Sequence, residues 1–161
     1  MFETERYFLT RFQESDFKDG LNLFTNPKVR KYLGGVQNPD FIRATLDAML
    51  APEDGSFYWV IREKSIGEFI GLVSLDPHHD GICKEVSYQL LPNWWSRGFA
   101  TETVTAILDF AMNDLQLPKL VAETQSSNQP SCNLLVKLGM TLERKVSRYG
   151  AEQSIYSIQS H

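Results

Sequence analysis

The stretch Pro92–Met112, PNWWSRGFATETVTAILDFAM, decides how the chain folds around its predicted site. A strand that ends at a proline turns through NWWSRGF and opens into an amphipathic helix with apolar residues three to four positions apart. The first turn of a helix exposes unpaired N–H groups at the positive end of its dipole, which favours an anion. Gly98 lets the backbone approach a ligand closely, and Arg97 adds a cation that suits phosphate. The junction therefore predicts an anion-binding site.

Two nucleotide-binding motifs do not fit this junction. A P-loop requires the pattern G-x-x-x-x-G-K-[ST], but SRGFATET lacks both the first glycine and the Lys-Ser/Thr pair. A dinucleotide fingerprint requires three glycines at the strand-to-helix turn, and this segment has one. A glycine and a cation are common at helix starts, so the anion has to be identified from the rest of the chain.

Composition indicates an ordinary globular chain. Its 161 residues are 42% hydrophobic and 22% charged, which suffices for one domain over residues 1–161 with a sizeable core. No apolar run approaches the length of a membrane span, and the acidic start MFETERYFLT does not resemble a signal peptide. These features favour a cytoplasmic protein without membrane contact.

Charge is spread unevenly along the chain. The net charge is −4, with 9 basic and 13 acidic side chains in residues 1–80 and seven of each in residues 81–161. A nucleic-acid binder would show a basic footprint, so this class is disfavoured. The neutral second half suits an anionic ligand, and the acidic first half suits a cationic substrate.

The cysteines and histidines do not predict a metal site. Cys83 and Cys132 are isolated in the sequence and are expected to be reduced, partly buried thiols. The sequence HHD at 78–80 lies between Pro77 and Gly81 in an expected turn, where adjacent residues rarely bind one ion together.

The order of expected elements predicts a mixed α/β fold. Ser15 is the expected N-cap of the first helix, and Leu115 is expected on the buried face that continues from the long helix. Strands are expected where β-prone residues alternate, at 6–12, 57–63, 68–76, 84–92, 119–125 and in a final hairpin over 141–159. Helices are expected where apolar residues recur at helical spacing, at 16–26, 27–33, 38–50, 98–113 and 130–140.

Five segments resemble, in the right order, motifs of the GCN5-related N-acetyltransferases (the GNAT superfamily). WWSRGFATE resembles the acyl-CoA-binding segment W-G-K-G-Y-A-T-E. TERYFLTRFQESDF resembles the opening T-E-R-L-x-L-R of the branch that includes the ribosomal-protein N-terminal acetyltransferases. IGEFIGLVSL, KEVSYQLLPNWW and ETQSSNQPSCNLLVKLGM resemble I-G-x-I-G-x-x-x-L, A-E-I-G-Y-x-L-x-P-x-x-W and E-T-x-x-x-N-x-x-S-x-x-x-x-E-K-L-G-F. The chain departs from these motifs at Ser96, where relatives carry glycine, and at Met140, where they carry phenylalanine.

The resemblance implies a single-domain fold with a central, mostly antiparallel twisted sheet of about seven strands, flanked by about four helices. It also implies that the strand 84–92 splays from the strand 119–125 and that the gap receives a thioester.

Acetyl-CoA is the cosubstrate that the resemblance implies. Its pantetheine arm would lie along the strand that ends at Leu90 and Leu91, as an added strand, and would contact Asn128. A free N–H near Leu90 would polarise the thioester carbonyl. The pyrophosphate would lie on the backbone N–H groups of Arg97, Gly98, Phe99, Ala100 and Thr101.

The implied chemistry is direct attack of an amine on acetyl-CoA in a ternary complex, with a base that takes a proton from the ammonium. Glu85 matches a strand carboxylate that serves as base in parts of the superfamily, and Glu152 in the last hairpin is the rival candidate. Either could instead be a solvated surface charge. Ser131 matches a serine near the CoA sulfur that would protonate the leaving thiolate, although it could instead satisfy its own helix start. Tyr88 is expected to serve packing.

The acceptor is left open by the sequence. A protein or peptide N-terminal α-amine is the first choice, because of the branch that the opening segment resembles. Small amines such as polyamines, amino acids or aminoglycosides are alternatives, and so is a non-catalytic module that binds CoA without turnover. Relatives in this family are often monomers or homodimers.

Overall fold

The computed structural model describes residues 2–53 and 55–160, which share one eight-stranded sheet. The strand order is β1-β2-β3-β4-β5-β6-β8-β7, and every neighbouring pair is antiparallel except β5 and β6. The strands are β1 (Phe2–Glu3), β2 (Tyr7–Arg11), β3 (Phe57–Glu63), β4 (Phe69–Pro77), β5 (Lys84–Leu90), β6 (Lys119–Gln125), β7 (Thr141–Arg148) and β8 (Ala151–Gln159). The helices are α1 (Phe17–Phe24), α2 (Pro27–Arg30), α3 (Pro39–Leu50), α4 (Phe99–Asp109) and α5 (Gln129–Lys137).

The predicted fold class, a mixed α/β fold around a mostly antiparallel sheet, is confirmed. The sheet has eight strands rather than about seven, because β1 adds an edge strand of two residues. So short a strand has no alternation for the sequence to reveal. The described residues hold five α-helices, the number expected from the spacing of apolar residues, rather than the about four that the resemblance implies. The separate helix expected after Pro27 is present as α2 but spans only four residues.

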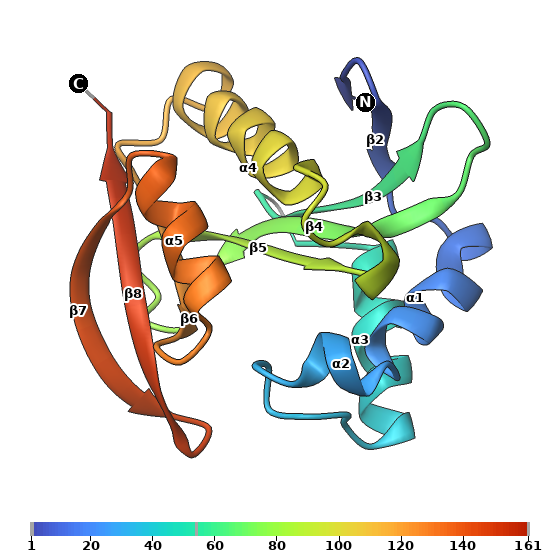
Figure 1. Ribbon diagram of the computed structural model, residues 1–161, viewed down its shortest axis with the longest axis horizontal. Helices are drawn as coiled ribbons and strands as arrows, with labels where there is room; N and C mark the ends of the chain where they lie inside the picture. Colours follow the sequence, from blue (N-terminus) through green and yellow to red (C-terminus); the bar gives the residue numbers. More distant parts are fainter. Residues whose placement is uncertain (1, 54, 161) are drawn as a thin grey trace.

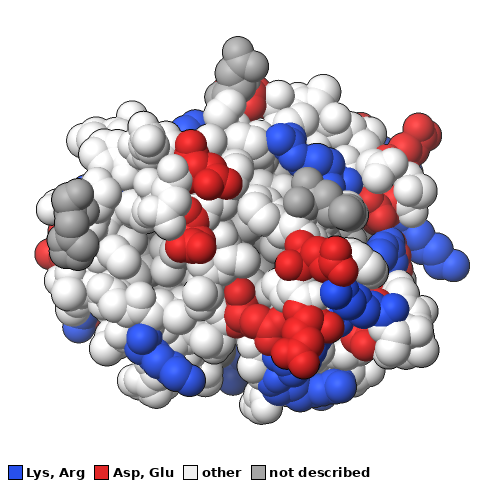
Figure 2. Space-filling view, turned by 90° about the horizontal axis from the view of Figure 1, so that it is seen from above, with Lys and Arg blue, Asp and Glu red and all other residues white. Residues whose placement is uncertain are grey.

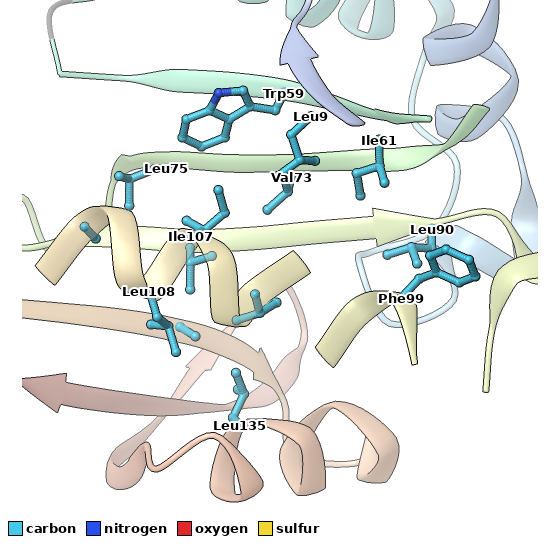
Figure 3. Packing of buried hydrophobic residues seen from close by; sticks show 14 of the residues in the cluster. Leu9, Trp59, Ile61, Val73, Leu75, Leu90, Phe99, Ile107, Leu108 and Leu135 are labelled. Atoms are coloured by element: carbon cyan, nitrogen blue, oxygen red, sulfur yellow. The ribbon is translucent and has the colours of Figure 1, made fainter. Parts of the chain in front are cut away.

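Helices cover both faces of the sheet, with α4 and α5 on one side and α1 to α3 on the other (Figure 1). Along β3, Trp59 and Ile61 are buried in the cluster that includes α4 and α5, whereas Val60 between them is buried against the other helices. This period of two is what a strand with both faces covered requires. Figure 3 shows the first cluster, to which α4 contributes Ile107 and α5 contributes Leu135.

Two helix details differ from the prediction. Ser15 lies inside a 3₁₀ turn, and Asp16 is the residue that precedes α1. Leu115 is 36% exposed rather than buried, because the chain continues beyond Asp109 as a π turn over residues 110–114. A π turn holds more residues than an α turn, so it rotates the following side chains relative to the α-helical stripe.

The close contact of β4 with β5 generates a prediction of stability. An ideal Cβ on Gly71 would lie 2.1 Å from the carbonyl oxygen of Gln89 and 2.8 Å from the Cα of Leu90. Gly71→Ala should therefore push β5 away from β4 and lower the free energy of unfolding in urea by about 1–3 kcal/mol. Gly67→Asn is the control, since a Cβ there meets nothing within 4 Å and Asn tolerates the φ of 72°. An alanine variant as stable as the wild type would contradict the predicted clash.

Candidate active site

A cavity of about 770 Å³ opens where β5 and β6 part. The two strands pair only at Lys84↔Leu120 and Glu85↔Val121, although β5 runs on to Leu90 and β6 to Gln125. Beyond Glu85 the strands diverge, and the end of β5, the first turn of α4, the middle of β6, α5 and α2 line the space between them. The splayed strand pair implied by the sequence motifs is therefore present.

The exposed edge of β5 presents backbone groups to this cavity. The N–H of Leu91 donates to the carbonyl of Ile70 in β4 at 2.9 Å. Residues of an antiparallel strand bond alternately to one side and the other, so the backbone of Leu90 and Tyr88 points toward β6. The carbonyl of Leu90 accepts a hydrogen bond from the indole Nε1 of Trp95 at 2.8 Å. Of the two leucines predicted to contact the pantetheine arm, only Leu90 lines the cavity, with its N–H toward the gap.

The start of α4 lines the cavity with backbone amides. Gly98 is the N-cap residue of α4 and has a φ of 82°, a conformation that glycine adopts without strain. Its carbonyl accepts the first helical hydrogen bond, from the N–H of Glu102 at 3.0 Å. The N–H groups of Phe99, Ala100 and Thr101 have no acceptor among the described residues, as expected for a first helical turn. The predicted anion site therefore has free donors and faces the cavity.

The backbone N–H groups at the start of α4 are called the anion cradle below. Two residues beside it show how the turn that precedes α4 is held in place. Ser96 has a φ of 59°, in the left-handed region, which the glycine of the resembled motif would adopt without strain. Arg97, predicted to face the pyrophosphate, turns its side chain onto the ring of Trp94, with its guanidinium carbon 4.5 Å from the ring centroid. The Arg97 guanidinium also donates to the carbonyl of Asn93 at 3.3 Å. Its side chain therefore braces the turn, and its contribution to an anion would come from its backbone.

Arg6 is a residue at the cradle that the sequence reasoning missed. Its Nη1 donates to the carbonyl of Arg97 at 2.8 Å, and its Nε donates to the carboxylate of Glu102 at 2.9 Å. Its guanidinium carbon lies 4.0 Å from the centroid of the Phe99 ring. Arg6 thus ties the start of β2 to the first turn of α4. The motif T-E-R in TERYFLTRF contained this residue, but nothing in the sequence indicated its partners.

The hydroxyls of Tyr88 and Ser131 lie 2.7 Å apart across the cavity. Tyr88, predicted to serve packing, therefore also places a polar group at the site, and burial raises the pKa of its hydroxyl. Asn128 is the N-cap of α5, and its Oδ1 accepts a hydrogen bond from the N–H of Ser131 at 3.4 Å. The cap fixes Ser131 at the helix start, so that its hydroxyl faces β5.

Glu85 is the last paired residue of β5 before the strands part. Its carboxylate accepts a hydrogen bond from the N–H of Glu123 at 3.2 Å. Burial, with the charges of Asp76 and Glu123 nearby, raises the pKa of Glu85 to about 8. A carboxyl group with a pKa in this range can exchange a proton near neutral pH, as a general base must.

Glu152, the rival candidate, lies elsewhere. It is exposed on β8, its carboxylate is 3.6 Å from the ammonium of Lys145, and it is not among the residues that line the cavity. Tyr88, Ser131, Asn128 and the start of α4 line one cavity. Neither candidate glutamate is among its lining residues, but the Glu85 carboxylate bonds to the N–H of Glu123, which does line it, whereas Glu152 lies beside Lys145 on the surface.

Other kinds of site find little support in the described part of the chain. Within residues 2–53 and 55–160, no helix combines the length and the apolar composition needed to cross a bilayer. The same residues hold no group of three or more His, Cys, Asp or Glu side chains placed to bind a metal ion. Seen from above, on the side of α4, acidic and basic side chains are interspersed over the surface (Figure 2).

Free amides at a helix start, beside two parted strands and an acid–base side chain, define an acyltransferase that uses a phosphate-bearing acyl carrier. The chain belongs to the GNAT acetyltransferase family, since residues 6–141 match the profile described as an acetyltransferase (GNAT) domain.

Similar proteins agree with this family. The chain is 26% identical over 155 residues to the uncharacterized N-acetyltransferase YoaA of Bacillus subtilis, covering 91% of this chain and 86% of the relative. An acetyltransferase structure from Agrobacterium tumefaciens is 25% identical, with a TM-score of 0.86 and coverage of 99% and 94%. A spermidine N-acetyltransferase from Vibrio cholerae, solved with CoA and spermine, shares the fold at 18% identity, with a TM-score of 0.82 and coverage of 98% and 97%. The ribosomal-protein branch suggested by the opening segment stays a prediction.

The amide cradle of α4 can be tested by adding a charge to it. Thr101→Asp places a carboxylate in the first turn, where it favours the helix but competes with an anion for the same N–H groups. We expect the dissociation constant for acetyl-CoA, measured by calorimetry, to rise roughly tenfold or more, with an unliganded melting temperature no lower than that of the wild type. Thr105→Asp, one turn later and exposed, is the matched control and should leave the affinity unchanged. Equal affinities in the two variants would exclude the cradle.

The raised pKa of Glu85 predicts a pH-dependent stability. Its folded-state pKa of about 8 lies above the ordinary value of 4.5, so the unfolded chain loses this proton first as the pH rises. Glu85 therefore lowers the free energy of unfolding progressively as the pH rises from 4.5 to about 8, and its effect is constant above that range. Relative to wild type, Glu85→Gln should gain little at pH 4 and roughly 4–5 kcal/mol at pH 9 in the free energy of unfolding. A difference independent of pH would contradict this titration.

Proposed function

We propose that the protein transfers an acetyl group from acetyl-CoA to a primary amine by direct attack in a ternary complex. The observation that carries this proposal is the parting of β5 and β6 directly after Glu85. The gap begins at a carboxylate of raised pKa and extends to the free amides of α4. The cavity thus lies between a proton acceptor, which is one hydrogen bond from the lining residue Glu123, and an anion cradle at the start of α4.

The residues present fit acetyl-CoA. The amides of Gly98, Phe99, Ala100 and Thr101 would hold the two phosphates, as helix N-termini do. The Nδ2 group of Asn128 remains for the pantetheine arm, because its Oδ1 caps α5. When bound, acetyl-CoA supplies an acetyl group activated as a thioester.

Side chains near the point where β5 and β6 part, called the inner end of the cavity, would move the protons. Glu85 takes a proton from the ammonium, and the freed nitrogen lone pair forms the bond to the acetyl carbon. The N–H of Leu90 donates to the carbonyl oxygen as charge develops on it. As the carbon–sulfur bond breaks, its electron pair remains on sulfur, and the Tyr88–Ser131 hydroxyl pair donates the proton that converts the thiolate to a thiol. The nitrogen loses its second proton to solvent as the amide forms, and solvent returns a proton to the hydroxyl pair.

Two acceptor classes are compatible with this chemistry. A protein or peptide N-terminal α-amine is suggested by the motifs of the opening segment, and a small amine is suggested by the fold shared with the spermidine N-acetyltransferase. Both are primary amines that need deprotonation, so the roles of the residues are the same for either.

Kinetics with a panel of primary amines test the proposal. Thiol release should require an amine, and kcat/KM should rise with pH through an inflection near 8, where Glu85 ionises. Glu85→Gln should lower kcat about a hundredfold or more and remove this inflection, as loss of a general base does. Glu152→Gln, the matched change at the rival carboxylate, should keep both.

Loss of the inflection in Glu152→Gln alone would reassign the base. Absence of thiol release with every amine, despite binding of acetyl-CoA, would support a non-catalytic CoA-binding module instead. Comparing Ser131→Ala with Tyr88→Phe identifies the proton donor. With amines that attack quickly, departure of the thiolate limits the rate, so loss of the donor should slow these amines most, and loss of the other hydroxyl should not.

A further inference from the structure

Exposed lysines line the part of the cavity next to α2, which is called its mouth below. Lys28 lies in α2, Lys31 follows it, and both are exposed residues that line the cavity, as does Lys137 at the end of α5. The ion pairs of the described residues involve other cations. Val29 packs in the cluster on the α1 and α3 face of the sheet, so α2 lies across the sheet from the amides of α4. The two lysines therefore face the cavity from the side opposite the phosphate cradle.

At the inner end of the cavity, the negative charge of Glu123 is already balanced by hydrogen-bond donors of the protein. Glu123 accepts hydrogen bonds from His78 Nε2 at 2.7 Å and from Arg148 Nε at 2.9 Å. The N–H of Asp80 donates to His78 Nδ1 at 3.3 Å, which leaves Nε2 as the nitrogen that carries the hydrogen. Although burial opposes it, the hydrogen bonds from Arg148 and His78 lower the pKa of Glu123. Its charge is therefore satisfied within the protein.

Two further carboxylates lie behind Glu123 rather than in the cavity lining: Glu85, which bonds to the N–H of Glu123, and Asp76, which is paired with Glu85 across β4 and β5. Asp76 accepts a hydrogen bond from the hydroxyl of Tyr58 at 3.2 Å, and burial raises its pKa. The only hydrogen bond to the Glu85 carboxylate among the described residues comes from the N–H of Glu123. Glu85, next to the lining residue Glu123, is thus the carboxylate that remains available for an ammonium entering from the cavity, and it can serve one cationic group.

We infer that the acceptor is a small amine that carries an anionic group, a carboxylate or a phosphate, at the end away from the reacting nitrogen. This inference rests on the proposed function. The ammonium meets Glu85 at the inner end, and the anionic group meets Lys28 and Lys31 at the mouth. A polyamine would bring its second ammonium toward these lysines, where like charges repel.

The overall charge of the first half pointed the other way, toward a cationic substrate. The structure shows where several of its acidic side chains are engaged. Asp16 and Asp19 pair with Arg62 at 2.8 and 3.0 Å, and Glu3 pairs with Lys64 at 2.7 Å. These residues are not among those that line the cavity, so the balance of charge along the chain differs from the balance around the cavity.

Amines matched in length test the inference. Butylamine, 4-aminobutyrate and putrescine present the same chain with a neutral, an anionic and a cationic end, and 3-aminopropyl phosphate replaces the carboxylate by a phosphate. We expect kcat/KM to be roughly threefold to tenfold higher for the anionic amines than for butylamine, and lower for putrescine than for butylamine. Which of the two anionic amines reacts faster distinguishes carboxylate from phosphate. The preference should shrink as salt is raised from about 0.01 to 1 M, because the lysines are exposed.

Charge-reversal variants test whether Lys28 and Lys31 cause the preference for anionic amines. Lys28→Glu and Lys31→Glu should each reverse the order of 4-aminobutyrate and putrescine while leaving the KM for acetyl-CoA unchanged. Lys18→Glu makes the same change at an exposed position of α1 that does not line the cavity, and should keep the wild-type order.

Three results would overturn the inference. Putrescine as the best wild-type substrate would show that the mouth accepts a second cation. A raised KM for acetyl-CoA with an unchanged order of amines would assign the lysines to the cosubstrate. Binding of acetyl-CoA without acetylation of any amine would remove the proposed function and the inference with it, whereas the first two results leave the proposed function standing.

Discussion

The site depends on a failure of strand pairing. β5 and β6 are the one parallel pair of the sheet, and their ladder ends at Glu85 and Val121 although both strands continue. Backbone groups that would bond within a sheet are left facing a cavity. On its other edge β5 is held by β4 along seven paired residues, so only the edge toward β6 is open. The cavity, its polar backbone edge and the position of Glu85 all follow from this divergence.

Charge compensation around the gap separates residues that hold the structure from residues available for chemistry. Glu123 is saturated by His78 and Arg148, and becomes a fixed part of the wall. Glu85, beside it, has one backbone N–H donor and no ion-pair partner, so burial and the charges of Asp76 and Glu123 outweigh the N–H and the more distant Arg148, and its pKa rises. Two adjacent carboxylates thus have opposite shifts because their hydrogen-bond partners differ.

The anion cradle depends on contacts from the other end of the chain. Arg6 bonds to the carbonyl of Arg97, 91 positions away, and to the carboxylate of Glu102. These contacts hold the turn before α4 on its outer side, so that the free amides of the helix start face inward. The strain at Ser96, which has a positive φ, is retained because the surrounding contacts fix the turn.

Local patterns in the sequence determined most of the elements, the helix start at Gly98 and the mixed α/β class, because periodicity and turn chemistry act over a few residues. They could not reveal a two-residue β1 or the π turn that exposes Leu115, since neither leaves a repeating pattern. Family motifs led to Glu85, but they could not choose it over Glu152. Tertiary structure alone placed the Glu85 carboxylate one hydrogen bond from the lining residue Glu123, brought Tyr88 to Ser131, and set lysines along the cavity. These properties come from contacts between segments far apart in the chain, and neither spacing nor net charge encodes such contacts.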